Sequence, residues 1–287
     1  MATDGRRIGV ALKWVDLRPE VDPLSGSVHD DGHSMGCSPA DRAALEWALV
    51  LAERWSADVT VATVGPVGAE ALLRDAVAAG ATEAVRVEAS GDEPSERVAA
   101  ALADVFAGAD LVCCGDYSPD RGSGSVPAYL AAHLGAAQAL GLVQIDPTAG
   151  DPADGAALTV TRRLDGGRRE ILSVPVPAVL SVEGSSAELR RAGLSAVLAA
   201  REVEIDVRPG AAATAAWGTV VRVTAVTPYR PRAQVLPAPS PELDVRDRVL
   251  ALTGALTERT PPRTVHADPV EAADLVLEQL RAWGELE

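Results

Sequence analysis

Residues 115–130 carry the side-chain types and the spacing that a phosphate-binding turn needs. A short apolar run ends at Gly115, polar and small residues fill the stretch from Tyr117 to Ser125, and apolar residues recur at helical spacing from Val126. Small residues in front of a helix leave backbone N–H groups pointing at one spot, where the helix dipole adds partial positive charge. We therefore interpret this segment as a cradle for a nucleotide phosphate, placed where open α/β sheets usually bind ligands.

Two common nucleotide-binding signatures are missing from the sequence. No G-x-G-x-x-G follows the first predicted strand, and no G-x-x-x-x-G-K-[ST] occurs, so the dinucleotide-dehydrogenase and P-loop patterns are both absent. The cradle follows the fourth predicted strand instead. This placement favours adenine-nucleotide folds whose phosphate turn does not lie at the first strand.

The segment G-H-S-M-G at residues 32–36 spells the G-x-S-x-G nucleophile elbow of serine hydrolases, with Ser34 as the nucleophile. An elbow needs a buried strand before the serine, whereas residues 27–31 are mostly polar. A serine hydrolase therefore remains an alternative hypothesis without structural support from its neighbours. His29 and His33 stand four residues apart, a spacing that places two ligands on one face only in a helix. Because both lie in a predicted loop, the spacing gives little support for a metal site.

The three cysteines indicate core packing and a reducing compartment. Cys113 and Cys114 lie in an apolar strand, where adjacent side chains point to opposite faces, so we expect two core residues rather than one metal site. Cys37 adjoins the predicted start of a helix, a position that could lower the pKa of its thiol. An odd number of cysteines, two of them adjacent, favours a reducing cytosol over a disulfide framework.

The elements that would position the cradle alternate between strand and helix over residues 8–135. Ser38 is suited to cap a helix, with Pro39 at its first position and Asp41 in its first turn. The alternation predicts an α/β fold, a Rossmann-like three-layer structure with a parallel sheet that binds an adenine nucleotide. The expected strands are 8–12, 59–64, 84–87 and 110–114, and the expected helices run from 38 or 39 to 52, over 69–79 and 94–106, and from 126.

Two regions depart from this alternation. Residues 16–38 form a polar stretch that we expect to be a loop, with a small hairpin at 24–28. Beyond Gly135, strand-like runs should add antiparallel strands to the sheet or form a ribbon, and a helix is predicted over 185–200. The added runs are 139–145, 158–163, 171–174 and 179–182.

The last part of the chain has the composition of an appendage. We predict a nucleotide-binding domain over residues 1–201 and a C-terminal arm over 202–287. Within the arm, a Pro-rich segment at 228–241 should be extended. The arm is also expected to hold a strand at 219–226 and helices at 243–256 and 270–283.

Composition excludes several classes of function. The formal net charge of −15 argues against a nucleic acid or an anionic membrane surface as partner. No apolar run approaches the roughly 20 residues of a membrane span, and the first residues do not resemble a secretory signal. Aromatic residues are 3% of the chain and apolar residues 47%, so the core must be built from Ala, Val and Leu. We expect a cytoplasmic protein with no membrane insertion.

Several stretches, taken in order, resemble the beta subunit of electron-transfer flavoproteins. V-A-L-K-W-V-D at residues 10–16 is similar to that family's V-A-V-K-x-V-x-D, and S-P-A-D at 38–41 to its N-P-F-D. The segment from D-L-V-C-C-G at 110 to residue 134 lines up without gaps on D-L-V-L-x-G-x-x-x-x-D-x-D-x-x-Q-T-G. R-L-D-G-G at 163–167 and V-P-A-V at 176–179 also have counterparts, so the likeness covers about residues 7–200.

The resemblance implies half of a heterodimer. The alpha subunit of that family carries most of the FAD contacts, and the beta subunit holds an AMP, or a second FAD in electron-bifurcating members. This chain would then shuttle electrons from a partner dehydrogenase by way of FAD, without a catalytic acid or base of its own. Within the resemblance, the departures from the family's motifs, together with an Ala- and Arg-rich composition, imply a specialised subgroup, such as the one associated with mycofactocin. The C-terminal arm is expected to wrap the alpha subunit.

The resemblance also implies which residues bind the nucleotide. Asp120 retains the family's first loop aspartate, whereas Gly124 and Pro127 replace an Asn and a Gly. Ser123 and Ser125 could supply hydroxyl groups to the phosphate in their place. The implied nucleotide-binding residues are Ala11, Ser38, Pro39, Ala40, Asp41, Val64, Ser118, Pro119, Asp120, Arg121, Gly122, Ser123, Gly124, Ser125, Val126, Pro127, Ala128 and Tyr129.

The family's partner-recognition loop corresponds to residues 182–198. Glu188 and Arg190 match the family's E-x-R, while Ser186 stands for its anchoring leucine and Leu189 for its proline. Loss of an apolar anchor would remove a hot spot, which favours a different partner dehydrogenase. The implied partner-recognition residues are Glu183, Ser186, Glu188, Leu189, Arg190 and Arg191.

A stand-alone adenine-nucleotide-binding module of the universal-stress-protein type is the alternative from another class. Its G-x-x-G-x9-G-[ST] spacing does not occur after Gly115. Tight ATP binding by the isolated chain would favour this alternative.

Overall fold

The computed structural model describes residues 5–22, 24–29, 32–91, 93–147, 157–210, 224–225, 238–253 and 264–283. The chain divides into two compact units, residues 1–229 and residues 230–287. The first unit contains the main sheet and every residue of the predicted nucleotide site.

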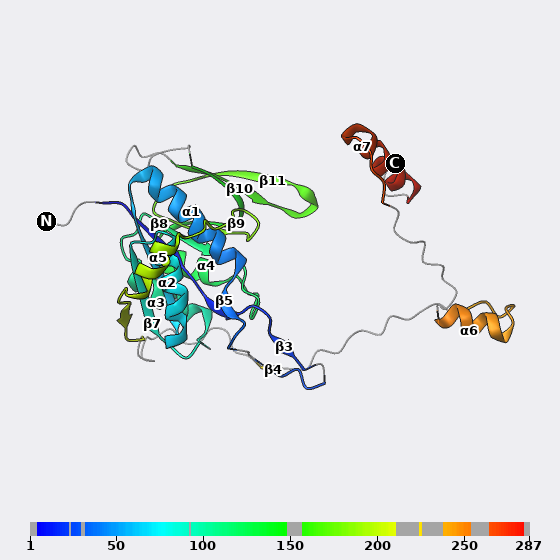
Figure 1. The fold of residues 1–287 in the computed structure, drawn as a ribbon, viewed down its shortest axis with the longest axis horizontal. Helices are drawn as coiled ribbons and strands as arrows, with labels where there is room; N and C mark the ends of the chain where they lie inside the picture. The colour runs from blue at the N-terminus through cyan, green and yellow to red at the C-terminus, as the bar shows by residue number, and fades with distance from the viewer. Residues whose placement is uncertain are drawn as a thin grey trace. The chain divides into compact units, whose positions relative to one another are not determined.

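Nine strands of the described residues form the main sheet, in the order β11-β10-β9-β12-β8-β1-β6-β7-β13 (Figure 1). The seven strands from β9 to β13 in this order pair in parallel, and only β10 and β11 are antiparallel. The fold is therefore a predominantly parallel α/β sheet, as the alternation predicts. The strands are β1 (Arg7–Ala11), β6 (Asp58–Gly65), β7 (Glu83–Glu88), β8 (Leu111–Gly115), β9 (Ala137–Asp146), β10 (Leu158–Arg163), β11 (Arg169–Val174), β12 (Ala178–Val182) and β13 (Asp206–Arg208).

Helices cover both faces of this sheet and complete the three layers. One hydrophobic cluster joins α1 and α2 to one face, and a second joins α3 and α4 to the other. Helix α5 packs beside α2. The first cluster is rich in Ala, Val and Leu, as the low aromatic content predicts. The helices are α1 (Pro39–Trp55), α2 (Glu70–Ala79), α3 (Ser95–Val105), α4 (Val126–Leu134) and α5 (Leu194–Arg201).

Helix α1 begins where its local sequence predicts. The Ser38 side chain caps it by accepting a hydrogen bond of 3.0 Å from the backbone N–H of Asp41, and Pro39 occupies the first turn. At its other end, Ser56 adopts a left-handed conformation with φ of 51°. The apolar face of this helix is buried and includes Ala44, Leu45, Ala48, Leu51 and Ala52.

The direction of two strands differs from the prediction. β9 and β12 pair in parallel, and β12 lies between β9 and β8 near the middle of the sheet. All five residues of β12 are buried, as in a strand covered on both faces. The prediction of antiparallel additions was therefore wrong for these two strands and right for β10 and β11, which form a hairpin.

The predicted helix over residues 185–200 is also wrong in its first half. Helix α5 starts only at Leu194, and the preceding residues are not helical. The backbone N–H of Arg190 donates to Glu46 Oε2 at 2.9 Å, so a tertiary contact with α1 holds this stretch in another conformation.

The predicted loop over residues 16–38 contains two short antiparallel pairs. β2 (Trp14–Asp16) pairs with β5 (Met35–Cys37), and β3 (Glu20–Val21) pairs with β4 (Val28–His29). The second pair provides the small hairpin expected near residues 24–28.

The described part of residues 230–287 contains two helices, α6 (Val245–Thr253) and α7 (Pro269–Ala282). Asp268 caps α7 by accepting from the backbone N–H groups of Val270 and Glu271. Neither helix buries a residue. The predicted strand at 219–226 and the Pro-rich segment lie mostly outside the described residues. The predicted domain boundary after residue 201 stays a prediction; β13, at Asp206–Arg208, belongs to the main sheet.

Candidate functional site

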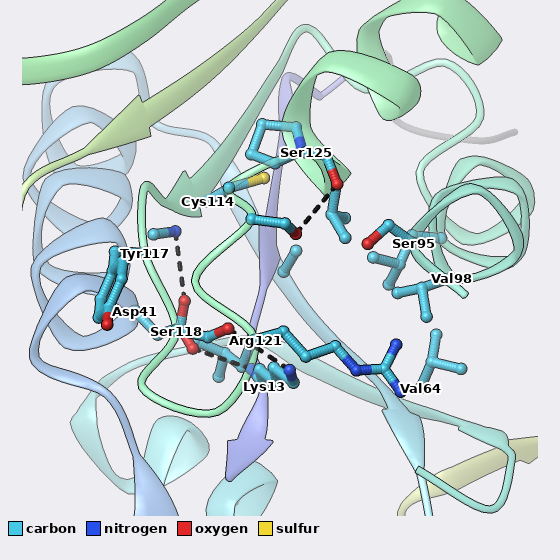
Figure 2. A pocket seen from close by; sticks show the side chains of 18 of the residues that line it. Lys13, Asp41, Val64, Ser95, Val98, Cys114, Tyr117, Ser118, Arg121 and Ser125 are labelled. Atoms are coloured by element: carbon cyan, nitrogen blue, oxygen red, sulfur yellow. Dashed lines mark hydrogen bonds between the residues drawn. The ribbon is translucent and has the colours of Figure 1, made fainter. Parts of the chain in front are cut away.

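A pocket opens where β1, β6 and β8 end and where α3 and α4 begin (Figure 2). Among the described residues, neither N-cap residue, Pro94 of α3 nor Ser125 of α4, makes a side-chain capping bond, so the first backbone N–H groups of both helices lack this partner. The pocket is lined by Ala11, Leu12, Lys13, Asp41, Val64, Gly91, Glu93, Ser95, Val98, Leu102, Cys114, Gly115, Asp116, Tyr117, Ser118, Arg121, Ser123, Gly124, Ser125, Val126 and Pro127.

A buried carboxylate joins the inner wall of the pocket. Asp41 is 6% exposed; its Oδ2 accepts from the backbone N–H of Lys13 at 3.0 Å and its Oδ1 from that of Gly115 at 3.2 Å. Burial raises the pKa of Asp41 from 3.8 to about 6, against these hydrogen bonds, which favour the ionised form. The start of α1 is thereby fastened to the ends of β1 and β8.

Two glycines let the backbone of the cradle approach its neighbours closely. A Cβ atom at Gly115 would lie 2.9 Å from Ala40 and closer still to a carboxylate oxygen of Asp41. Gly124 has a φ of 56°, and its Cβ would lie 2.6 Å from the carbonyl oxygen of Asp116. Larger residues would therefore close or distort the turn between β8 and α4.

An ion pair crosses the outer part of the pocket. Lys13 Nζ lies 2.5 Å from Asp120 Oδ2. It also lies 3.4 Å from Ser118 Oγ, and Figure 2 shows Lys13 and Ser118 side by side. Partial burial opposes ionisation of Asp120, but hydrogen bonds from Lys13 and Ser118 and the charge of Lys13 outweigh it and lower the pKa of this carboxyl.

Arg121 supplies a second cation. Its Nη1 donates to the backbone carbonyl of Glu93 at 2.6 Å, and Figure 2 shows its side chain extending toward Val64 and Val98. On the α4 side, the hydroxyl groups of Ser123 and Ser125 lie 3.1 Å apart. Two cations, hydroxyl groups and uncapped helix starts make an arrangement suited to a phosphate.

The structure brings many of the implied nucleotide-binding residues to this pocket. Ser38, Pro39 and Ala40 instead form the start of α1 behind it, and Asp120 contributes through its contact with Lys13. The implied residues that line the pocket are Ala11, Asp41, Val64, Ser118, Arg121, Ser123, Gly124, Ser125, Val126 and Pro127, and those that do not are Ser38, Pro39, Ala40, Pro119, Asp120, Gly122, Ala128 and Tyr129.

Sequence reasoning missed Lys13 and the α3 side of the pocket. Lys13 directly follows the first strand, so its position at a strand end was a usable signal. Glu93 and Ser95 lie before and at the start of α3, the same kind of strand-to-helix junction as the cradle. The contact of Lys13 with a residue 107 positions away could not be read from local pattern.

The expected burial of Cys113 and Cys114 is confirmed, whereas the expected lowering of the Cys37 pKa is not. Cys113 and Cys114 are both buried, the first in the cluster with α1 and the second in the cluster with α3 and α4. Burial raises the pKa of the Cys113 thiol to about 12. The expected lowering at Cys37 is wrong, because burial and the nearby Asp41 raise the pKa of this thiol above its ordinary value.

Ser34 lacks the surroundings of a nucleophile elbow. It precedes β5, which pairs antiparallel with β2, rather than following a parallel strand of the main sheet. Its hydroxyl donates to Asp16 Oδ1. A carboxylate in this position does not supply the imidazole base that a triad requires.

The implied partner-recognition residues lie along one segment held against α1. Ser186 Oγ accepts from Trp47 Nε1 at 3.2 Å. Arg190 pairs with Glu46, with Nη2 to Oε1 at 3.0 Å, and also with Glu53, and these carboxylates raise the pKa of the guanidinium. Leu194, in the first turn of α5, is 75% exposed.

Two features are absent among the residues that the structure describes. Among these residues, no three acidic, histidine or cysteine side chains gather as a metal ion would require. Likewise, no helix that the structure describes has the length and apolar character to cross a membrane.

Comparison with known proteins gives consistent matches. A family model described as "Electron transfer flavoprotein domain" matches residues 26–213. The chain is 28% identical to the electron transfer flavoprotein subunit beta of Syntrophomonas wolfei, over 69% of this chain and 77% of that protein. It is 30% identical to Protein FixA of Azorhizobium caulinodans, over 69% and 73%. It is also 32% identical to the electron transfer flavoprotein subunit beta of Clostridium acetobutylicum, over 61% and 67%.

Proposed function

The chain belongs to the electron transfer flavoprotein family, on the side of its beta subunits, and on that premise we propose what it binds and how it works. It pairs with an alpha subunit that holds the FAD and binds an adenylate in the pocket beside β1, β6 and β8. The adenylate is AMP or the corresponding part of a second FAD.

One observation carries the assignment of the pocket: two uncapped helix starts, two cations and a glycine-containing turn meet at the carboxyl ends of three parallel strands. A Cβ at Gly115 would collide with Ala40 and Asp41 at the start of α1, and a Cβ at Gly124 with the carbonyl oxygen of Asp116, so both glycines permit the close backbone approach that a phosphate-binding turn uses. Lys13 and Arg121 supply positive charge to an otherwise acidic lining. Val64, Val98 and Leu102 form an apolar wall that suits an adenine ring.

The flavin, when bound, supplies the redox chemistry of the heterodimer. The residues of this chain bind and orient the adenylate and build part of the dry surroundings in which the cofactors sit. We do not assign the role of catalytic acid or base to any of these residues. We place the protein in the cytoplasm, where a reducing environment suits its three buried thiols.

We assign docking of the partner dehydrogenase to the segment that includes Glu183, Ser186, Glu188, Leu189, Arg190 and Arg191. Within it, Ser186 is bonded to Trp47, so the apolar anchor has to lie elsewhere. Leu194 and Leu198, one turn apart on α5, are 75% and 50% exposed and form the nearest apolar pair. Arg190 holds the segment on α1 and so orients this pair.

We assign to the C-terminal unit, residues 230–287, the role of contacting the alpha subunit. Helix α7 carries Val270 and Val276 on its surface, 73% and 58% exposed, and Trp283, which directly follows the helix, is 68% exposed. Apolar side chains of this kind on an unburied helix suit a protein surface. The arm is therefore expected to stabilise the heterodimer rather than the nucleotide site.

Co-purification tests the proposal. The full chain, co-expressed with an alpha subunit of the family, should give a stable complex that absorbs near ~450 nm, because bound flavin provides the chromophore. A matched variant, Arg121→Ala, should retain the flavin of the alpha subunit and lose adenylate from the beta-subunit pocket. Two chains that never associate, or a complex without flavin, would contradict the heterodimer.

A further inference from the structure

The only lysine of the chain lies in the nucleotide pocket. The sequence contains 25 arginines and one lysine, Lys13. Lys13 follows β1, and its ammonium group contacts Asp120 and Ser118 in the cradle; Figure 2 shows the second of these residues beside it. Every other basic residue of the chain, apart from histidine, is an arginine. We therefore infer that this position needs the compact, flexible cation of a lysine side chain.

The ammonium group is accessible to a ligand. Lys13 and Ser118 line the pocket, and the side chains of Lys13 and Asp120 are 37% and 32% exposed. An ammonium group has three N–H donors, and the contacts with Asp120 and Ser118 use two of them. A phosphate oxygen can therefore reach this cation without opening the core.

Because the pocket is lined by more carboxylates than cations, the binding of an anion there depends strongly on Lys13. Three carboxylates line the pocket, those of Asp41, Glu93 and Asp116, against the two cations Lys13 and Arg121. Asp120 adds a fourth negative charge 2.5 Å from Lys13 and so neutralises one of the two cations. A phosphate that enters has to compete with this carboxylate for the ammonium group.

We propose that Lys13 binds the phosphate of the nucleotide and that Asp120 competes with the phosphate for it, so that the ion pair limits nucleotide affinity. This inference rests on the nucleotide site proposed above. To that site it adds two roles: Lys13 binds the phosphate, and Asp120 limits the affinity of that binding.

Calorimetric titration of AMP into the full chain, purified with its alpha subunit, tests both residues. Lys13→Met should weaken AMP binding about 10- to 100-fold, the usual effect of losing a hydrogen bond to a charged group. Asp120→Asn should strengthen AMP binding roughly twofold to fivefold, the strength of a partly exposed ion pair. In the double variant Lys13→Met/Asp120→Asn, the stronger AMP binding caused by Asp120→Asn should disappear, because there is no longer a lysine for which Asp120 and the phosphate compete.

Glu170→Gln provides a matched control. Glu170 pairs with Arg162 at the same 2.5 Å, with side chains 39% and 38% exposed, on the β10–β11 hairpin. This variant makes the same charge change at the same kind of ion pair, and AMP affinity should not change. Unchanged affinity in Lys13→Met, or weaker binding in Asp120→Asn, would overturn the inference.

Side-chain acetylation gives a second readout that does not depend on those variants. Because the sequence holds no other lysine, a peptide carrying an acetylated lysine reports on Lys13 alone. AMP should protect Lys13 from acetylation, and adenosine, which has no phosphate, should not. If AMP binds and Lys13 stays reactive, this inference fails while the proposed function stands. If the wild-type protein binds no AMP, both fail.

Discussion

Two aspartates lie at the pocket, Asp41 in its lining and Asp120 beside it, and the two are held in opposite ways. Asp41 on the inner wall is buried and bonded to backbone N–H groups, and its pKa is raised to about 6. Asp120 reaches the pocket only through its ion pair with Lys13; it is partly exposed, and its pKa is lowered. The first carboxylate fastens elements together, whereas the second holds a cation that a ligand can use. The same side chain serves structure or binding according to its partners and its burial.

The largest effect is expected on the inner wall. Asp41→Ala leaves the buried N–H groups of Lys13 and Gly115 without their acceptor, so the free energy of unfolding should fall by about 2–4 kcal/mol. Asp120→Ala, at the ion pair with Lys13, should change this free energy by less than about 1 kcal/mol, since partly exposed ion pairs contribute little. Urea denaturation of both variants measures the difference. Equal losses would show that the two aspartates have the same role.

The pH dependence of stability should have opposite signs at the two aspartates. The pKa of Asp41 is raised on folding, so its contribution is complete below about pH 4 and is lost as pH rises through about 6. The stability of the wild type relative to Asp41→Asn should therefore decrease from pH 4 to pH 7, by on the order of 3 kcal/mol.

For Asp120 the sign is reversed. Its pKa is lowered on folding, so its contribution is present at neutral pH and is lost as pH falls through that lowered value. The stability of the wild type relative to Asp120→Asn should therefore increase with pH. Urea unfolding of the three proteins at several pH values provides both differences, and slopes of the same sign would contradict the contrast.

Arg190 repeats the contrast on a smaller scale, because it pairs with two carboxylates of different exposure. The side chain of Glu46 is 14% exposed and that of Glu53 is 66% exposed. A double-mutant cycle of Arg190→Met with Glu46→Gln should give a coupling energy of about 1 kcal/mol. The matched cycle with Glu53→Gln should give less than about 0.5 kcal/mol. A larger coupling with Glu53 would show that exposure does not decide the strength of these contacts.

The smallest effect on stability is expected at Leu194. This side chain is 75% exposed, so Leu194→Ser should change the free energy of unfolding by less than about 0.5 kcal/mol. Binding of the partner dehydrogenase should nevertheless weaken by about tenfold or more, as for loss of an apolar hot spot. Surface plasmon resonance against the partner measures this effect, with Leu24→Ser on the β3–β4 hairpin as the control, because Leu24 is also an exposed leucine, at 89%. Equal weakening in both variants would remove Leu194 from the docking surface.

The sequence predicts what is decided locally. Ser38 and Pro39 mark the start of α1 because capping depends on neighbouring residues, and the alternation of strands and helices predicts the parallel sheet. Cys113 and Cys114 occupy opposite faces, as adjacent strand residues must.

What the sequence could not predict depends on contacts between distant segments. The direction of β12 follows from its place between β8 and β9, and strand periodicity is the same in both directions. The non-helical stretch before Leu194 depends on the contact between Arg190 and Glu46, 144 residues apart. Lys13 belongs to the pocket only because the fold brings it to Asp120.

Identification of the nucleotide tests the central claim most directly. The heterodimer of the full chain and its alpha subunit would be denatured, and the released cofactors would be separated and quantified by mass spectrometry. The account predicts one FAD from the alpha subunit and, in addition, one adenylate per beta subunit, either AMP or a second FAD. One FAD per heterodimer with no further adenylate, even after incubation with millimolar AMP, would contradict it.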